Sequence, residues 1–69
     1  MAIFSERLLE LRTEKKLSQV AVAMQTGITS RTYQRYESGE REATVSTLIS
    51  MADFYGVTID YLVGRSDKR

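Results

Sequence analysis

The 69-residue chain contains no cysteine and no histidine, which excludes disulfide bonds and thiolate metal sites and removes the commonest general base. Hydrophobic residues make up 42% and charged residues 28%, as in an ordinary globular domain, and no apolar run approaches the roughly 20 residues that span a bilayer. The net charge is only +1, but residues 1–35 hold six Lys or Arg against three Asp or Glu, whereas residues 36–69 hold four against six. Any surface that binds an anion is therefore expected mainly in the first half.

The first segment has the spacing of an amphipathic helix. Phe4, Leu8 and Leu11 recur at four and three residues, with Arg12 at the edge of their stripe. This spacing predicts a helix over about 5–15. The side chains expected to face water are Glu6, Arg7, Glu10 and Glu14.

Two further short helices follow. Ser18 is a good N-cap for a helix over about 19–26, which Gly27 would end because glycine tolerates the left-handed geometry after a helix. Thr29 would cap a third helix over about 30–37. A connection of three or four residues that contains glycine sets two helices at a steep angle, so a helix-turn-helix is predicted here. The residues expected where the two helices meet are Val22, Ala23, Ile28, Tyr33 and Tyr36.

The predicted third helix has two chemically different faces. At about 100° per residue, the two tyrosines and Glu37 point one way, and the opposite face carries Ser30, Arg31, Gln34 and Arg35. This outer face holds two cations and no acid. Arginine pairs well with the edge of guanine and glutamine with that of adenine, so these four residues are candidates to contact DNA bases.

The second half of the chain continues in helices. A fourth helix lies between the N-cap Thr44 and Gly56, and a short fifth lies between Thr58 and Gly64. Residues 65–69 form a polar tail that we expect to fray. The predicted fold is all-α: one compact domain of five helices spanning residues 1–69, with a core over about 5–64.

This series of helices resembles the lambda-repressor/Cro-like helix-turn-helix family. The resemblance rests on Leu17-Ser18-Gln19, Ala23, Gly27-Ile28-Thr29-Ser30-Arg31, Tyr33-Gln34-Arg35-Tyr36-Glu37-Ser38-Gly39 and the stretch from Leu48 to Gly64. It covers about residues 5–64 and implies a five-helix DNA-binding domain without cofactor or metal.

The resemblance also implies roles for individual residues. Its base-reading positions are matched by Ser30, Arg31, Gln34 and Arg35, and its phosphate- or backbone-contacting positions by Gln19, Thr29, Thr32, Ser38 and Arg41. Gln19 would bind a phosphate with the help of the helix N-terminus. Arg12 and Glu37 match a partly buried ion pair that joins the first helix to the third.

The chain departs from the family pattern in two places. Val20, Ala21 and Met24 stand where the family tends to carry charges, so the second helix could present an apolar contact surface. Glu40 and Glu42 flank Arg41, and two acids beside a phosphate would weaken its contact with DNA.

The function expected from these features is sequence-specific binding of double-stranded DNA by a transcriptional regulator, a repressor that acts as a homodimer on a palindromic operator. Half-sites would lie about 34 Å apart. The expected dimer surface is the fourth and fifth helices, including Ile59, Tyr61, Leu62 and Val63. A cytoplasmic location is expected, with a possible regulatory partner protein and neither a membrane nor a small-molecule site.

An alternative is a protein-interaction module, antirepressor- or antitoxin-like, that uses the same fold to bind a partner protein. The apolar residues of the second helix and the acids at 40 and 42 favour it, whereas the acid-free face of the third helix speaks against it. An enzyme is not expected, because the chain lacks His, Cys, a glycine-rich phosphate loop and paired carboxylates.

Overall fold

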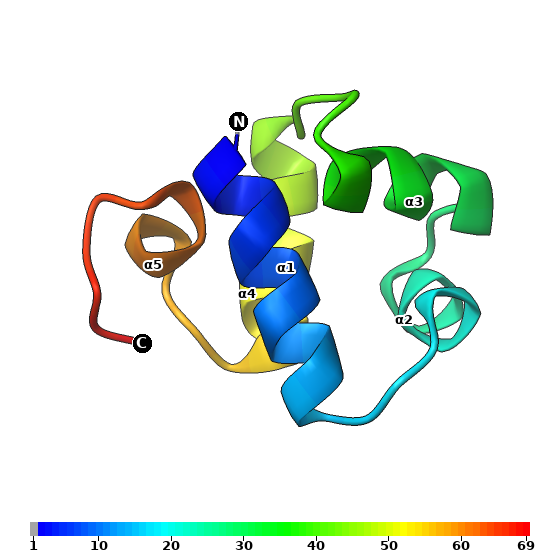
Figure 1. Cartoon of the computed structure of the whole chain (residues 1–69), viewed down its shortest axis with the longest axis horizontal. Coiled ribbons are helices and arrows are strands. Elements are labelled where there is room, and N and C mark those ends of the chain that lie inside the picture. Colours follow the sequence, from blue (N-terminus) through cyan, green and yellow to red (C-terminus); the bar gives the residue numbers. More distant parts are fainter. Residues whose placement is uncertain (1) are drawn as a thin grey trace.

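Five α-helices joined by short connections make up residues 2–69, the part of the chain that this computed structural model describes (Figure 1). The helices are α1 (Ala2–Glu14), α2 (Gln19–Thr26), α3 (Ser30–Ser38), α4 (Val45–Tyr55) and α5 (Ile59–Val63). The predicted all-α fold of five helices is confirmed. The first helix begins at Ala2 rather than near residue 5, because Phe4 lies in the core and extends the apolar stripe by a turn.

Helices α2 to α5 begin and end in the same way. Each follows a Ser or Thr whose hydroxyl accepts the backbone N–H three residues later, as predicted for Ser18, Thr29, Thr44 and Thr58. Each is closed by a glycine in the left-handed conformation. These local hydrogen bonds keep the connections short and force the helices to cross one another.

The core lies between α1 and the other four helices. Figure 1 shows α1 crossing the middle of the molecule, with α5 on one side and α2 and α3 on the other. The fully buried side chains among the described residues are Phe4, Leu8, Val22, Tyr33, Met51 and Leu62. No described side-chain polar atom is buried without a hydrogen-bond partner. None of the helices in residues 2–69 is both long and apolar enough to cross a membrane.

Two residues of α5 occupy a different place from the one expected. Tyr61 and Leu62 were predicted to contribute to a dimer surface, but both are buried in the core of the single chain. The reason is that α5 is only five residues long and packs on both α1 and α4. Its one apolar face is therefore used within the chain.

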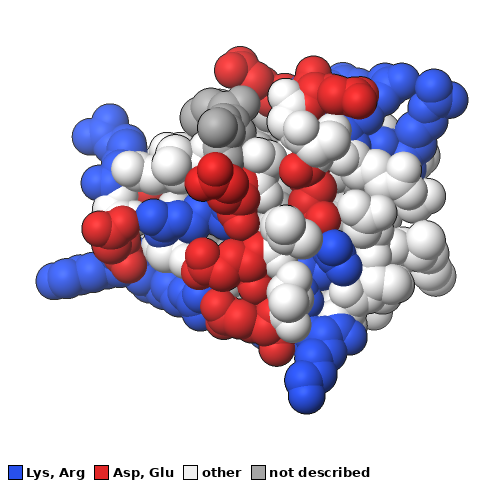
Figure 2. All heavy atoms as spheres, viewed as in Figure 1, with Lys and Arg blue, Asp and Glu red and all other residues white. Residues whose placement is uncertain are grey.

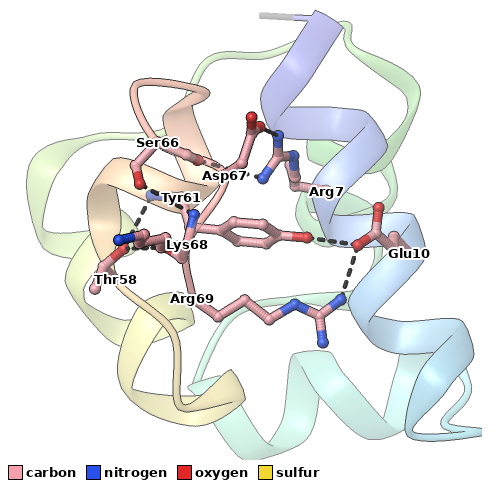
Figure 3. A network of polar contacts seen from close by, with 8 residues as sticks. All are labelled: Arg7, Glu10, Thr58, Tyr61, Ser66, Asp67, Lys68 and Arg69. Atoms are coloured by element: carbon pink, nitrogen blue, oxygen red, sulfur yellow. Dashed lines mark hydrogen bonds and ion pairs between the residues drawn. The ribbon is translucent and has the colours of Figure 1, made fainter.

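The polar tail is fastened to α1 rather than frayed. The Arg69 guanidinium binds Glu10 at 2.8 Å and also binds Glu14, and Asp67 pairs with Arg7 at 2.9 Å. Figure 3 shows Tyr61 between the tail and α1, with its hydroxyl directed at Glu10, to which it donates a hydrogen bond of 2.5 Å. The expectation of a frayed tail is therefore wrong.

The same contacts correct the expectation that Arg7 faces water. Its side chain is only 16% exposed, and its guanidinium carbon lies 3.9 Å from the centre of the Tyr61 ring, a cation–π contact. The guanidinium carbon of Arg69 lies 5.3 Å from the same ring. Hydrogen bonds from Tyr61 and Arg69 lower the pKa of Glu10. The contacts of Tyr61 and Arg69 with α1 join residues more than 50 positions apart, so helical spacing alone could not indicate them.

We predict that Gly64→Ala destabilises the fold by about 2 kcal/mol, because two costs add at this position. Gly64 has a φ of +83°, and a Cβ there would lie 2.5 Å from Cγ2 of Ile3. Gly27→Ala is the matched control: its φ is +76° but nothing lies within 4 Å of the added carbon, so about 1 kcal/mol is expected. Urea denaturation measures both losses, and Ile3→Ala should partly rescue Gly64→Ala. Equal losses in the two glycine variants would contradict the Ile3 contact.

Candidate nucleic-acid interface

The turn between α2 and α3 sets the angle of the site. Gly27 adopts a left-handed conformation, and the backbone N–H of Ile28 donates to the carbonyl of Ala23 at 3.1 Å. Thr29 then caps α3. Val22 and Ala23 on α2 are buried in the same core as the tyrosines of α3, and Ile28 packs against it. The two helices therefore meet through apolar contacts, and the predicted helix-turn-helix is present.

The outer face of α3 borders a shallow hollow. Its volume is about 280 Å³, and it is lined by Arg31, Gln34, Arg35, Ser38 and Glu40. The structure thus brings together three of the four residues predicted to contact bases, and adds Ser38 from the predicted phosphate contacts. Ser30 lies at the start of α3 and does not line the hollow.

The two arginines of this hollow have no partner of their own. Neither Arg31 nor Arg35 forms an ion pair within residues 2–69, whereas Arg7, Arg12 and Arg69 all do. In Figure 2 basic side chains lie at the corner of the molecule beside α3, next to acidic side chains along the top edge, and a second group of acidic side chains runs down the middle. The N–H groups of the two guanidiniums are therefore free to bind an external acceptor.

Behind this face, Arg12 and Glu37 form a two-pronged ion pair. Arg12 donates from Nε to Oε2 of Glu37 at 2.7 Å and from its Nη2 to Oε1 at 3.0 Å. Its remaining terminal nitrogen donates to the carbonyl of Leu17 at 2.8 Å. Such a paired arrangement fixes orientation as well as supplying energy. It joins α1 to α3 and to the segment that leads into α2, as the family resemblance implied for these two residues.

The environment of Glu37 keeps it ionised. Burial alone would raise its pKa, but hydrogen bonds from Arg12, Tyr33 and Gln19 outweigh this effect, and the pKa is lowered. The hydroxyls of Tyr33 and Tyr55 lie 3.0 Å apart, and burial raises the pKa of both. The polar network therefore extends from the ion pair into the core and reaches α4.

The other predicted DNA contacts are held by local hydrogen bonds. The Gln19 amide donates to Glu37 at 3.2 Å, so α2 is joined to the ion pair at its first residue. Thr29 donates from its hydroxyl to that of Thr32 at 2.9 Å, and Ser38 donates to the carbonyl of Arg35 at 3.1 Å. Arg41 is exposed and forms no ion pair with any described residue. Gln19 was predicted to contact phosphate, and its link to Glu37 was not anticipated because the two lie 18 residues apart.

Glu40 was not predicted as part of the site, although it lines the hollow. The signal in the sequence is Gly39, whose left-handed conformation turns the chain back across the end of α3. No group of three or more potential metal-binding side chains converges within residues 2–69.

Comparison with known proteins matches this fold to helix-turn-helix proteins. A family model described as helix-turn-helix matches residues 8–62. The chain is 41% identical over 68 residues to the HTH-type transcriptional regulator YqaE of Bacillus subtilis, covering 97% of this chain and 59% of the relative. It is 38% identical over 65 residues to the cryptic phage CTXphi transcriptional repressor RstR of Vibrio cholerae, covering 94% and 59%. The chain thus spans less than two thirds of the length of these relatives, which are transcriptional regulators rather than enzymes.

Two solved structures have the same arrangement of helices. A transcriptional regulator from Listeria innocua matches with a TM-score of 0.82 and 34% identity, over 88% of this chain and 57% of that one. The P22 c2 repressor, solved in complex with a synthetic operator, also matches with a TM-score of 0.82 over 86% of this chain and 89% of that one. At 24% identity, this second likeness shows the fold alone.

We predict that Glu37→Gln lowers the free energy of unfolding by about 3 kcal/mol at neutral pH, because it leaves the Arg12 charge without its partner in a mostly buried place. The side chains of Glu37 and Arg12 are 6% and 20% exposed. Urea denaturation measures the loss, and Glu6→Gln, on the exposed side of α1, is the control.

The loss of stability in Glu37→Gln is expected to depend on pH. The pKa of Glu37 is lower in the folded chain than its ordinary 4.5, so its contribution is present above that ordinary pKa and is lost as the pH falls through the lowered value. The difference between Glu37→Gln and the unmodified chain should therefore shrink on acidification. A difference that stays constant down to about pH 2 would contradict an ionised Glu37 as its source.

Proposed function

Because this chain belongs to the helix-turn-helix family of the Cro/C1 type, we propose that it is a transcriptional regulator that binds double-stranded DNA in a sequence-specific manner. The observation that carries this proposal is the hollow on the outer face of α3, where Arg31 and Arg35 lie beside Gln34 and form no ion pair within residues 2–69. In a chain with a net charge of only +1, unpaired cations on one face supply a local attraction for a polyanion.

In this proposal α3 enters the major groove of the duplex. An α-helix fits that groove, and residues near the helix N-terminus contact the edges of the bases. Arg31 and Arg35 would donate to O6 and N7 of guanine, and Gln34 would pair with adenine. Ser30, at the first turn of α3, stays a candidate for the same role.

Contacts with the DNA backbone would position α3 in the groove. Gln19 begins α2, where unpaired backbone N–H groups favour a phosphate, and its link to Glu37 holds it on the side of α3. Thr29, Thr32, Ser38 and Arg41 would contact phosphate or sugar. Such contacts set the register of the protein on DNA without selecting a sequence.

We propose further that the protein is a repressor that acts as a homodimer on a palindromic operator. One recognition helix contacts only a few base pairs, so two copies related by a two-fold axis are needed for a useful site. With Tyr61 and Leu62 in the core and Val63 half-buried, the exposed apolar side chains on α4 and α5 are Val45 and Ile49, 71% and 46% exposed, and Ile59. The relative RstR is named a transcriptional repressor, which favours repression.

A second candidate function is binding of a partner protein by the same fold. Met24 is 77% exposed on α2 and Val20 is also exposed, so this helix presents apolar side chains and no charge to its surroundings. A mobility-shift assay separates the two functions. The absence of DNA binding at low salt would favour the partner protein over the duplex.

We predict that Arg35→Ala costs about 1–3 kcal/mol in binding to the selected duplex and relaxes selectivity at one or two base pairs, and Arg31→Ala should act similarly. The duplex would be obtained by selection from random DNA with the purified protein, which also reveals the symmetry of the site. Arg65→Ala is the control, since it removes an exposed cation at the far end of the chain that pairs only loosely with Asp60. Gln19→Ala should weaken binding to all DNA sequences alike. Unchanged affinity and selectivity in both arginine variants would show that α3 is not the recognition helix.

We predict that Ile49→Asp shifts the dimer toward monomer, because a charge in an apolar interface must be stripped of water without a partner. Sedimentation equilibrium measures the association constant. Leu9→Asp is the matched control, because Leu9 is 48% exposed on α1, a helix outside the proposed dimer surface. An equal effect of the two substitutions would exclude α4 as the dimer surface.

A further inference from the structure

Glu40 differs in chemistry from every other residue that lines the hollow. On α3 the hollow is lined by two arginines, which only donate hydrogen bonds, and by Gln34 and Ser38, which both donate and accept them. The Glu40 carboxylate only accepts them. The hollow therefore carries two cations on α3 and one acidic residue, Glu40, just beyond the end of that helix.

The backbone holds Glu40 at this place. Its N–H donates to the carbonyl of Arg35 at 3.0 Å and to the hydroxyl of Ser38 at 3.4 Å. The N–H of Arg41 donates to the same Arg35 carbonyl at 3.3 Å. The left-handed Gly39 makes this wrap around the end of α3 possible. The backbone of Glu40 thus belongs to a hydrogen-bonded turn at the end of α3.

The carboxylate is not consumed by a contact inside the chain. Glu40 is exposed and forms no ion pair with Arg31, Arg35 or any other described residue. When DNA covers the hollow, the Glu40 carboxylate loses bound water. Without a hydrogen-bond donor on the duplex to replace that water, this loss costs binding energy. A sequence that offers a donor at that place is therefore favoured over one that does not.

We propose that Glu40 is a specificity-determining residue whose carboxylate accepts a hydrogen bond from the exocyclic amino group of cytosine or adenine at the edge of the site that α3 contacts; this rests on the proposed function. These are the amino groups that bases expose in the major groove, at N4 and N6. Guanine and thymine present only acceptors there and would face the carboxylate unfavourably. Glu40 would thus attract cytosine or adenine at this position and repel guanine or thymine.

The test combines a variant of the protein with a variant of the base. Site selection from random DNA is carried out with the unmodified protein and with Glu40→Ala, and the position whose preference changes is identified. The cytosine or adenine there is then replaced by its analogue without the amino group. The control is Asp53→Ala, which removes one negative charge from an exposed place on α4 outside the hollow. Thermal melting verifies that both variants fold.

We expect removal of the amino group to lower the affinity of the unmodified protein and of Asp53→Ala for the duplex by about tenfold. The affinity of Glu40→Ala should not change. If the analogue weakens all three proteins alike, or if Glu40→Ala selects the same site and only binds every duplex more tightly, the proposal is overturned. An unmodified protein that selects no sequence at all would instead refute the proposed function itself.

Discussion

The ion pair between Arg12 and Glu37 is the interaction on which the geometry of the site depends. Glu37 lies on the inner side of α3, opposite the hollow, and receives hydrogen bonds from Arg12 on α1 and Gln19 on α2. Three helices are therefore joined at one carboxylate. Because an ion pair with two parallel hydrogen bonds restricts orientation, it determines how the outer face of α3 is presented to a ligand.

The arginines are divided between structure and surface. Arg7 and Arg69 hold the tail and α5 against α1, and Arg12 holds the helix-turn-helix. Arg31 and Arg35 have the same side chain but no ion pair within the described residues. In a chain with so little net charge, these two unpaired cations beside each other favour the proposed placement of the DNA-binding surface on α3.

Helices α4 and α5 differ in how their apolar side chains are used. Helix α5 and the tail close the core through Tyr61, which lies near the guanidiniums of Arg7 and Arg69. This use of α5 leaves α4 as the main source of exposed apolar side chains for a second copy, with Val45 and Ile49 one turn apart. The recognition face and the proposed dimer face therefore belong to different helices of one small domain.

The sequence by itself determined the helices and the outer face of α3, because both depend on contacts between neighbours in the chain. An N-cap hydroxyl binds an N–H three residues away, and the 3.6-residue period places Arg31, Gln34 and Arg35 together. Only the tertiary structure decided the rest. The bound tail and the link of Gln19 to Glu37 join residues 18 to 60 positions apart. Such contacts depend on how helices pack, which helical spacing does not specify.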